Sequence, residues 1–258
     1  MKILNDDPID SWVSNGLYAL LYKVLDSTNV KALHLMAENK IAGPTAIISE
    51  SQTQGRGQLQ TKWHSSPNLN LTFTLALPKL SVAVNDQFKL NKAVCLAILQ
   101  SLDEYTSELK IKWPNDIYWE QKKLAGVLIE NQIQGANIKR SVIGIGLNVN
   151  EKVWAADIPN PVSLSQITGQ EIDLNSFRQK FIGKFYAAFN FFMKQGMHSI
   201  DQLYSAQMLR INEWGKFFAE NLEFDGKIIG TDNSGNLLVE NKNGIVNHYH
   251  LKSIKFVF

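Results

Sequence analysis

The chain has 258 residues, of which 45% are hydrophobic, so it is long enough for one large globular domain and a small one. Its formal net charge of +2 gives no strong field for binding nucleic acid or a membrane surface. One cysteine, Cys95, excludes a framework of intrachain disulfides and suits a reducing compartment.

The sequence also lacks the marks of a secreted or membrane protein. Residues 1–8 show no basic region followed by a long apolar stretch. No later apolar run approaches the roughly 18–20 residues that span a bilayer. We therefore expect a cytoplasmic protein.

The first half of the chain predicts alternating helices and strands. Asp26, Ser27 and Thr28 each offer an N-cap for a helix whose apolar residues follow at helical spacing. A strand is expected over residues 45–50, and strict alternation over residues 69–77 predicts a half-buried strand. Residues 90–102 carry apolar side chains at helical spacing, which favours a core position for Cys95 over a catalytic one.

Three further strands are expected near residues 109–113, 126–131 and 141–148. Pro114 fixes its own φ and biases Trp113 toward an extended conformation, so the first of these strands should stop abruptly and present Asn115 and Asp116. Strands interleaved with helices predict a mixed α/β sheet with helices packed against it.

The last third of the chain differs from the first two thirds in its sequence pattern. Asn175 or Ser176 is expected to cap a helix with phenylalanines at every third or fourth residue, ended by Gly196, and this stripe favours core packing. From about residue 214, short apolar runs separated by Asp-Gly and Asn-Gly turns predict a small β-barrel. His248 and His250 would share one strand face, but without acidic or cysteine partners we expect simple exposure over a metal site.

Three blocks of the sequence could carry chemistry. Lys-Trp-Pro-Asn-Asp at residues 112–116, with Lys-Leu-Ala-Gly at 123–126, crowds two lysines and a carboxylate beside a rigid turn, and such a site could activate a carboxylic acid. An ordinary turn with solvated lysines is the alternative. Gly-Arg-Gly at residues 55–57 runs on to Lys62 and Trp63, and Gly-Ile-Gly-Leu-Asn-Val-Asn occupies residues 144–150. Neither glycine pair fits the phosphate-loop pattern.

In this order, and with Ser-Thr-Asn at residues 27–29 ahead of them, these blocks resemble those of the biotin–protein ligases, over nearly the whole chain. The resemblance implies an α/β (α+β) fold: a class II synthetase-like mixed-sheet catalytic domain over residues 1–212 and a small SH3-like β-barrel over residues 213–258. It also implies the reaction. Biotin is activated with ATP to biotinyl-5′-AMP with release of pyrophosphate, and is then transferred to a lysine of a biotin carboxyl carrier domain with release of AMP.

Attack of a carboxylate on the α-phosphate of ATP brings negative charges together, so fixed cations and Mg²⁺ are needed. The resemblance implies that Lys123 contacts the biotin carboxylate and the developing phosphate charge, and that Arg56 lies in a loop shielding the acyl-adenylate. It implies that Asp116 lies near the incoming acceptor lysine, whose proton a carboxylate could draw off. Lys112 either supports the phosphates or packs its stem under Trp113.

The biotin head is a cyclic urea that needs matched polar partners when buried. By resemblance, the biotin site comprises Ser27, Thr28, Asn29, Gln52, Gly55, Arg56, Trp63, Lys123, Gly126, Gly144 and Gly146, with the last three glycines along the valeryl tail. The nucleotide site comprises Arg56, Lys112, Asn115, Lys123, Asn148 and Trp154, the last as the adenine-stacking residue. No side chain is assigned to a metal, and Mg²⁺ is expected with ATP.

The sequence departs from the family pattern at Gln58, where many members carry a second arginine. The change removes a positive charge and bears on how tightly the adenylate is held. One rival is a lipoate–protein ligase or octanoyltransferase. The Gly-Arg-Gly loop favours biotin, and the transferase needs a nucleophilic cysteine, for which Cys95 is badly placed.

A second rival is a biotin-sensing repressor or a binding module without catalysis. Only 26 residues precede Ser27, so we expect no winged-helix domain and no binding to operator DNA. A catalytically dead binder would have Lys123 or Asp116 replaced, and both are present. The oligomeric state is left open, including a homodimer.

Overall fold

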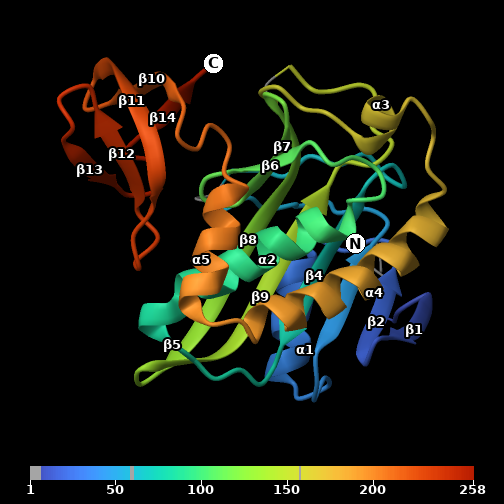
Figure 1. Ribbon diagram of the computed structural model, residues 1–258. Coiled ribbons are helices and arrows are strands. Elements are labelled where there is room, and N and C mark those ends of the chain that lie inside the picture. The colour runs from blue at the N-terminus through green and yellow to red at the C-terminus, as the bar shows by residue number, and fades with distance from the viewer. Residues whose placement is uncertain (1–6, 59–60, 157) are drawn as a thin grey trace.

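The structure, a computed structural model, describes residues 7–58, 61–156 and 158–258, so most of the N-terminal segment tested for a leader lies outside the described residues. Within these ranges the chain forms a nine-stranded sheet with helices on both faces and a separate five-stranded antiparallel sheet at the C-terminal end. Figure 1 shows the second sheet standing to one side of the first. The predicted fold class is confirmed.

The large sheet has the order β1-β2-β3-β4-β9-β8-β7-β6, and β5 pairs with β9. Only β2 and β3 pair in parallel, so the sheet is mixed. Its strands are β1 (Asp10–Ser14), β2 (Leu17–Tyr22), β3 (Thr45–Ser49), β4 (Leu71–Leu77), β5 (Val82–Ala83), β6 (Leu109–Lys112), β7 (Asp116–Trp119), β8 (Lys122–Gln134) and β9 (Asn137–Leu147).

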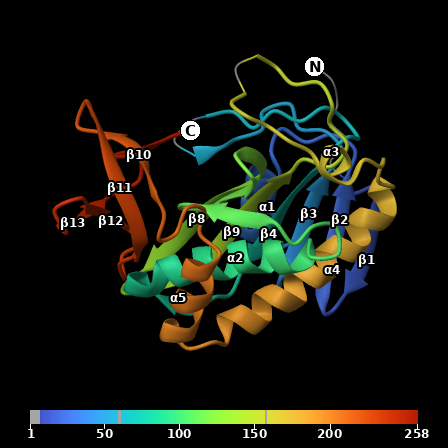
Figure 2. The same cartoon turned by 45° about the horizontal axis from the view of Figure 1, so that its top comes forward.

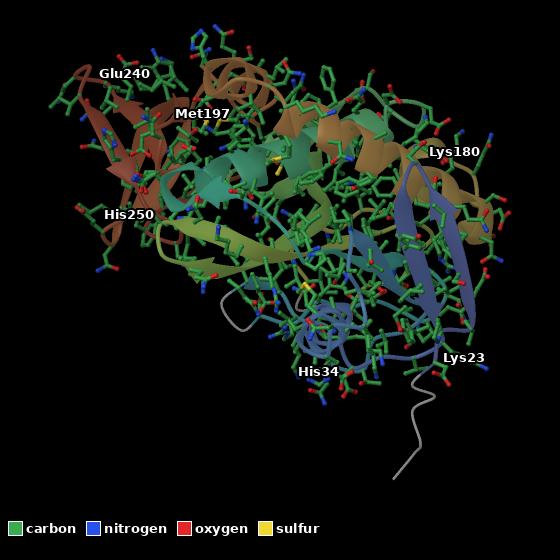
Figure 3. The ribbon with its side chains drawn as sticks, turned by 90° about the horizontal axis from the view of Figure 1, so that it is seen from below. Lys23, His34, Lys180, Met197, Glu240 and His250 are labelled. Atoms are coloured by element: carbon green, nitrogen blue, oxygen red, sulfur yellow. The ribbon has the colours of Figure 1, made fainter. Side chains whose placement is uncertain are left out.

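Helices cover the two faces unequally. One face carries α1 (Thr28–Ala37), which contacts β3, β4 and β9. The other carries α2 (Gln87–Ser101), preceded by the short helix η2 (Val84–Asp86), together with α4 (Leu174–Met193) and α5 (Met197–Ala206). Figure 3 shows His34 of α1 and Met197 of α5 on opposite sides of the sheet. The remaining helix, α3 (Leu164–Thr168), follows the long connection after β9.

Strand β4 is buried on both of its faces. Every residue of this strand is buried, so the prediction of a half-buried strand was wrong. Thr74 donates hydrogen bonds to Thr28 and Asn29 of α1 on one side, while the Phe73 ring meets the Phe181 and Phe185 rings of α4 on the other. Alternation detects the two faces of a strand, but it does not show that a helix covers the polar one.

The aromatic stripe of α4 lies in the core, as predicted, and so does Cys95, whose thiol pKa is raised by burial. The expected helix ends were wrong. Asp173 is the N-cap and accepts a hydrogen bond from the Asn175 backbone, while α4 ends at Met193. Gly196 is instead the N-cap of α5, a helix that the sequence reading missed.

The C-terminal sheet has the order β13-β12-β11-β10-β14. Its strands are β10 (Trp214–Ala219), β11 (Leu222–Thr231), β12 (Leu237–Asn241), β13 (Val246–Tyr249) and β14 (Lys255–Val257). His248 is exposed and its Nδ1 lies 3.0 Å from the Asp232 carboxylate. No group of three histidine, cysteine or acidic residues suited to a metal occurs among the described residues.

The C-terminal sheet docks on the end of the 112–116 motif. Trp113 Nε1 donates to the backbone carbonyl of Gly235 in the β11–β12 turn at 2.9 Å. The Phe258 ring stacks on Tyr118 of β7 with the centroids 6.2 Å apart. Strands β1, β2, β5, β7, β10 and β14 were not predicted from the sequence. No helix of the described chain is long and apolar enough to cross a membrane.

The fold predicts a large loss of stability for Phe185→Ala. Phe185 is fully buried, and its ring contacts Phe73, Phe181 and Phe189. The cavity left behind should lower the free energy of unfolding by about 3–5 kcal/mol. The matched control is Phe191→Ala on the same helix, where the ring is 54% exposed and a change within about 0.5 kcal/mol is expected. Urea unfolding measures both, and equal losses would contradict the packing described.

Candidate active site

A cavity of about 260 Å³ opens where the start of α1, the loop after β3 and the middle of β8 and β9 meet. Most of the residues predicted for the biotin site line it. They are Ser27, Thr28, Asn29, Gln52, Arg56, Trp63, Lys123, Gly126, Gly144 and Gly146. Asp116 lines it as well, and Gly55 lies in an adjoining hollow of the same loop. Residues from distant parts of the chain are thus brought together in one cavity.

The start of α1 forms the polar end of this cavity. Ser27 is the N-cap residue, and the Thr28 backbone N–H and hydroxyl both donate to Oε1 of Gln52, at 2.8 and 3.2 Å. Asn29 Oδ1 accepts from the Thr74 hydroxyl at 2.5 Å. Thr28, Asn29 and Thr74 are buried and Gln52 is partly buried, and their hydrogen bonds hold these donors and acceptors in place.

The Gly-Arg-Gly loop folds back on itself as a narrow hairpin. Arg56 and Lys62 form an antiparallel bridge, the Gly57 N–H donates to the Thr61 carbonyl at 2.7 Å, and the Trp63 N–H donates to the Gly55 carbonyl at 3.1 Å. A Cβ at Gly55 would overlap the Trp63 carbonyl oxygen. The two loop segments approach this closely only because the glycines lack side chains.

The Arg56 guanidinium is held by a carboxylate that the sequence reading missed. Arg56 Nη2 lies 3.1 Å from Oε2 of Glu130 on β8. The same oxygen accepts a hydrogen bond from Asn29 Nδ2 at 2.7 Å. Glu130 therefore joins the loop, the start of α1 and the strand beneath them.

Lys123 and Asp116 form the second ion pair of the cavity. Lys123 Nζ lies 2.8 Å from Asp116 Oδ1, and both side chains are about seven-tenths buried, with 29% and 27% exposed. The Lys123 ammonium also lies 5.8 Å from the centroid of the Trp63 ring. Of the basic residues that line the cavity, Arg56 and Lys123 therefore each face a carboxylate.

The glycines of β8 and β9 make room for protein side chains. A Cβ at Gly146 would overlap the Trp63 indole, and one at Gly144 would overlap Asn29 Oδ1. At Gly126 a Cβ would come within 3.1–3.3 Å of Trp63 and Lys123. These three glycines therefore set the positions of Trp63, Asn29 and Lys123 as well as lining the cavity.

A second cavity of about 460 Å³ adjoins the first and shares Lys123 and Trp63 with it. Two residues predicted for the nucleotide site, Asn148 and Trp154, line it. Asn148 is buried and its Nδ2 donates to the carbonyls of Lys123 and Val162, so it fixes the backbone that carries Lys123. Nε1 of Trp154 is buried without a hydrogen-bond partner in the described chain.

The other two residues predicted for the nucleotide site line neither cavity. Asn115 is buried, and its Nδ2 donates to the Val127 carbonyl at 3.0 Å. The Lys112 ammonium lies over the Tyr118, Phe256 and Phe258 rings, at 5.1, 5.4 and 5.8 Å from their centroids. Phe256 belongs to β14 and Phe258 directly follows it, so the C-terminal end of the chain supplies two of these rings.

The structure adds Glu130, Thr74 and Lys252 to the site, and no sequence motif pointed to them. Glu130 directly follows the apolar Gly-Val-Leu-Ile run at residues 126–129, and this position was the one available signal.

The chain is similar to known protein ligases. Residues 21–148 match the model of the biotin/lipoate A/B protein ligase family. The bifunctional ligase/repressor BirA of Bacillus subtilis is 32% identical over 241 residues, which cover 91% of this chain and 73% of that protein. A biotin–[acetyl-CoA-carboxylase] ligase of Paracoccus denitrificans is 28% identical, covering 85% of this chain and 92% of its own.

Among solved structures, the biotin protein ligase of Aquifex aeolicus in complex with biotin and ATP matches with a TM-score of 0.71 at 26% identity. The match covers 93% of this chain and 99% of that one. The fold and its paired cavities thus define a ligase. The chain belongs to the biotin/lipoate A/B protein ligase family.

The buried position of Lys112 predicts a pH-dependent effect on stability. Burial lowers the pKa of this ammonium, Asp116 opposes the shift, and Lys123 adds to it. The folded chain therefore holds the proton less tightly than the unfolded chain. The charge costs stability at neutral pH, and the cost disappears as pH rises from the folded pKa to the ordinary value of 10.5.

Lys112→Met should therefore be more stable than the wild type at pH 7, with the difference shrinking toward pH 10.5, as measured by urea unfolding across that range. Lys216→Met is the matched control. A hydrogen bond with Glu223 raises the pKa of Lys216, so removing this charge should lower stability slightly at pH 7. A loss of stability in Lys112→Met at pH 7 would mean that the aromatic rings and Asp116 outweigh burial.

Proposed function

We propose that this chain is a biotin–protein ligase. It activates biotin with ATP to biotinyl-5′-AMP and then transfers biotin to a lysine of a biotin carboxyl carrier domain. The observation that carries the proposal is the place of Lys123, which lines both cavities and faces Asp116. The biotin ligases among the relatives support biotin as the acid.

In the first step, the first cavity holds biotin and the second holds the nucleotide. The urea head meets the buried polar groups at the start of α1, and its carboxylate points toward Lys123. A carboxylate oxygen attacks the α-phosphorus of ATP, forming the acyl–phosphate anhydride as pyrophosphate leaves. Lys123 stands where charge builds up between the two ligands, and Arg56 adds a second cation from the loop.

Mg²⁺ is proposed to enter as part of MgATP, since this ion prefers phosphate oxygens, water and one or two carboxylates. Its charge lowers the repulsion between the attacking carboxylate and the phosphates. Trp154 is proposed to contact the adenine ring. Its place in the lining of the second cavity supports that role.

In the second step, Asp116 receives the acceptor lysine. Before substrates bind, the Lys123 ammonium forms an ion pair with the Asp116 carboxylate. The anionic carboxylate and phosphate attract Lys123, so Asp116 becomes available to the incoming ammonium. Asp116 takes a proton, the neutral amine nitrogen attacks the acyl carbon, and AMP leaves with the electrons of the broken C–O bond.

We further propose that residues 1–212 form the catalytic domain and residues 213–258 the SH3-like domain, supported by the start of the separate sheet at Trp214. We also propose a cytoplasmic location, where ATP is available and Cys95 stays reduced.

The function is tested by incubating the purified chain with MgATP, a biotin carboxyl carrier domain, and either biotin or lipoate. Intact-mass spectrometry of the carrier then reports the transferred acid. A gain of one biotin supports the proposal, a gain of one lipoate assigns the chain to the other acid of its family, and no gain with either contradicts ligase activity.

Lys123→Ala and Asp116→Asn should separate the two steps. Without Lys123 neither pyrophosphate release nor carrier labelling should proceed well, and kcat/KM for activation should fall at least about 100-fold, in the range of a lost charge-stabilising donor. Asp116→Asn should keep most of the pyrophosphate release and lower transfer by about 100-fold, since a positioned base contributes about that much. Equal loss of both steps in Asp116→Asn would contradict its role at the acceptor.

Gly146→Ala should weaken biotin binding. The added Cβ would overlap the rigid Trp63 indole, and overpacking of this kind costs about 1–3 kcal/mol, which is about 5- to 150-fold in affinity. Gly43→Ala is the control, because a Cβ there meets nothing within 4 Å. Isothermal titration with biotin measures both. Unchanged affinity for biotin in Gly146→Ala would mean that the Trp63 indole does not form a wall of the biotin site.

A further inference from the structure

The three residues before Asp116 are each held by a different part of the fold. Trp113 Nε1 donates to a backbone carbonyl of the C-terminal sheet, and Asn115 Nδ2 donates to a backbone carbonyl of β8. Between them lies Pro114, which has no backbone N–H and is held through its carbonyl. The backbone that carries Asp116 is therefore anchored immediately ahead of the carboxylate.

The Pro114 carbonyl receives hydrogen bonds from two helices. Asn91 Nδ2 of α2 donates to this oxygen at 2.8 Å, and the Tyr204 hydroxyl of α5 donates to it at 2.7 Å. Both side chains are buried, and two donors fill both lone pairs of a carbonyl oxygen. We propose that Tyr204, together with Asn91, is a positioning residue for biotin transfer, because it holds the segment that presents Asp116 to the acceptor amine. This inference rests on the proposed function, which gives Asp116 that role.

Tyr204 is itself fixed by its neighbours. It is fully buried, its ring meets the Phe88 ring edge-on with the centroids 5.8 Å apart, and the Lys92 ammonium lies 5.8 Å from its centroid. Lys92 Nζ also lies 2.6 Å from Asp201, three residues before Tyr204 on α5. Figure 2 shows α5 beside α2, on the side of the molecule that carries the C-terminal sheet. Burial raises the pKa of the Tyr204 hydroxyl well above its ordinary value of 10.0, so the group keeps its proton and remains a donor.

The same cluster packs against the C-terminal sheet. A Cβ at Gly235 would overlap the Phe88 ring, and the Gly235 carbonyl accepts the hydrogen bond from Trp113. Directly after α5, the chain pairs with β6 through two backbone hydrogen bonds of Ile111, both of 2.8 Å. The end of α5 is thus fixed to the strand that leads into residues 113–116. The donor of Tyr204 and its acceptor are held in one rigid unit.

This anchor should matter after activation rather than before it. While Lys123 pairs with Asp116 at 2.8 Å, the ion pair itself fixes the carboxylate. In the proposed second step the anionic intermediate attracts Lys123, and Asp116 is then held through its own backbone. A base acts only within hydrogen-bond reach of the proton that it takes, so a small shift of this backbone slows transfer. Activation depends on Lys123 and Arg56, and the Pro114 carbonyl holds neither of them.

The experiment measures the two steps separately in the full chain. The burst of pyrophosphate with biotin and MgATP, without carrier, reports activation, and intact-mass spectrometry of the carrier reports transfer. In a third reaction hydroxylamine replaces the carrier. This amine is neutral at pH 7, so it attacks the acyl-adenylate without a base.

Tyr204→Phe should release pyrophosphate and react with hydroxylamine at the wild-type rates. Its kcat for transfer to the carrier should fall about tenfold, since a displaced catalytic group costs up to about 100-fold and Asn91 still holds the carbonyl. KM for the carrier should stay the same, because the fully buried Tyr204 does not touch it. A general loss of structure would instead lower all three reactions.

Asn91→Ala removes the other donor and should show the same selective loss. The double variant should lose more than the product of the two single losses, because the buried carbonyl is then left without a donor. Tyr186→Phe is the matched control. Tyr186 is a buried tyrosine of α4 whose hydroxyl makes no hydrogen bond within the described ranges, so transfer should match the wild type.

Transfer at the wild-type rate in both single variants would overturn this inference and leave the proposed function intact. An equal fall in activation, hydroxylamine reaction and transfer would also overturn it, because the two side chains would then support the fold in general. If Tyr204→Phe does not fold, Asn91→Ala decides between these outcomes. Failure of the wild type to label the carrier would overturn the proposed function and this inference with it.

Discussion

The ion pair between Lys123 and Asp116 is the interaction on which the rest of the site depends. It forms because β7 and β8 are consecutive antiparallel strands whose register shifts between Ile117 and Tyr118, close to both charged residues. Asn148, directly after β9, donates a hydrogen bond to the Lys123 carbonyl and so fixes the backbone there. An aspartate at the start of one strand and a lysine near the start of the next are thereby held at the junction of two cavities.

The same arrangement recurs at Arg56 and Glu130, so Arg56 and Lys123 each face a protein carboxylate. Both pairs are about one-third exposed, and ion pairs at such depth contribute only about 0–1 kcal/mol. An incoming carboxylate or phosphate can therefore exchange for the protein carboxylates at small cost. In the proposed reaction, the exchange at Asp116 would couple activation of the acid to readiness for the acceptor amine.

The C-terminal sheet takes part in this site through packing and charge. Trp113 hydrogen-bonds to Gly235, and the Phe256 and Phe258 rings surround Lys112, so two residues of the 112–116 motif serve domain docking. The motif joins the two sheets at the same place where Asp116 enters the cavity. Catalytic geometry and domain position therefore depend on the same short segment.

The sequence by itself determined the local features of this protein. Apolar spacing predicted the core helix that holds Cys95, and the order of short motifs predicted that Arg56, Asp116 and Lys123 belong to one site. Helix ends and the burial of β4 were predicted less well, because they depend on neighbours rather than on spacing.

Only the tertiary structure decided the partners across the site. Glu130 meets Arg56 across 74 residues and Asn29 across 101. Lys252 reaches the cavity from another sheet, while Lys112 turns away from it. Such contacts depend on strand register, helix placement and domain docking. No local pattern in the chain encodes them, because each residue's own neighbours in sequence are compatible with many partners in space.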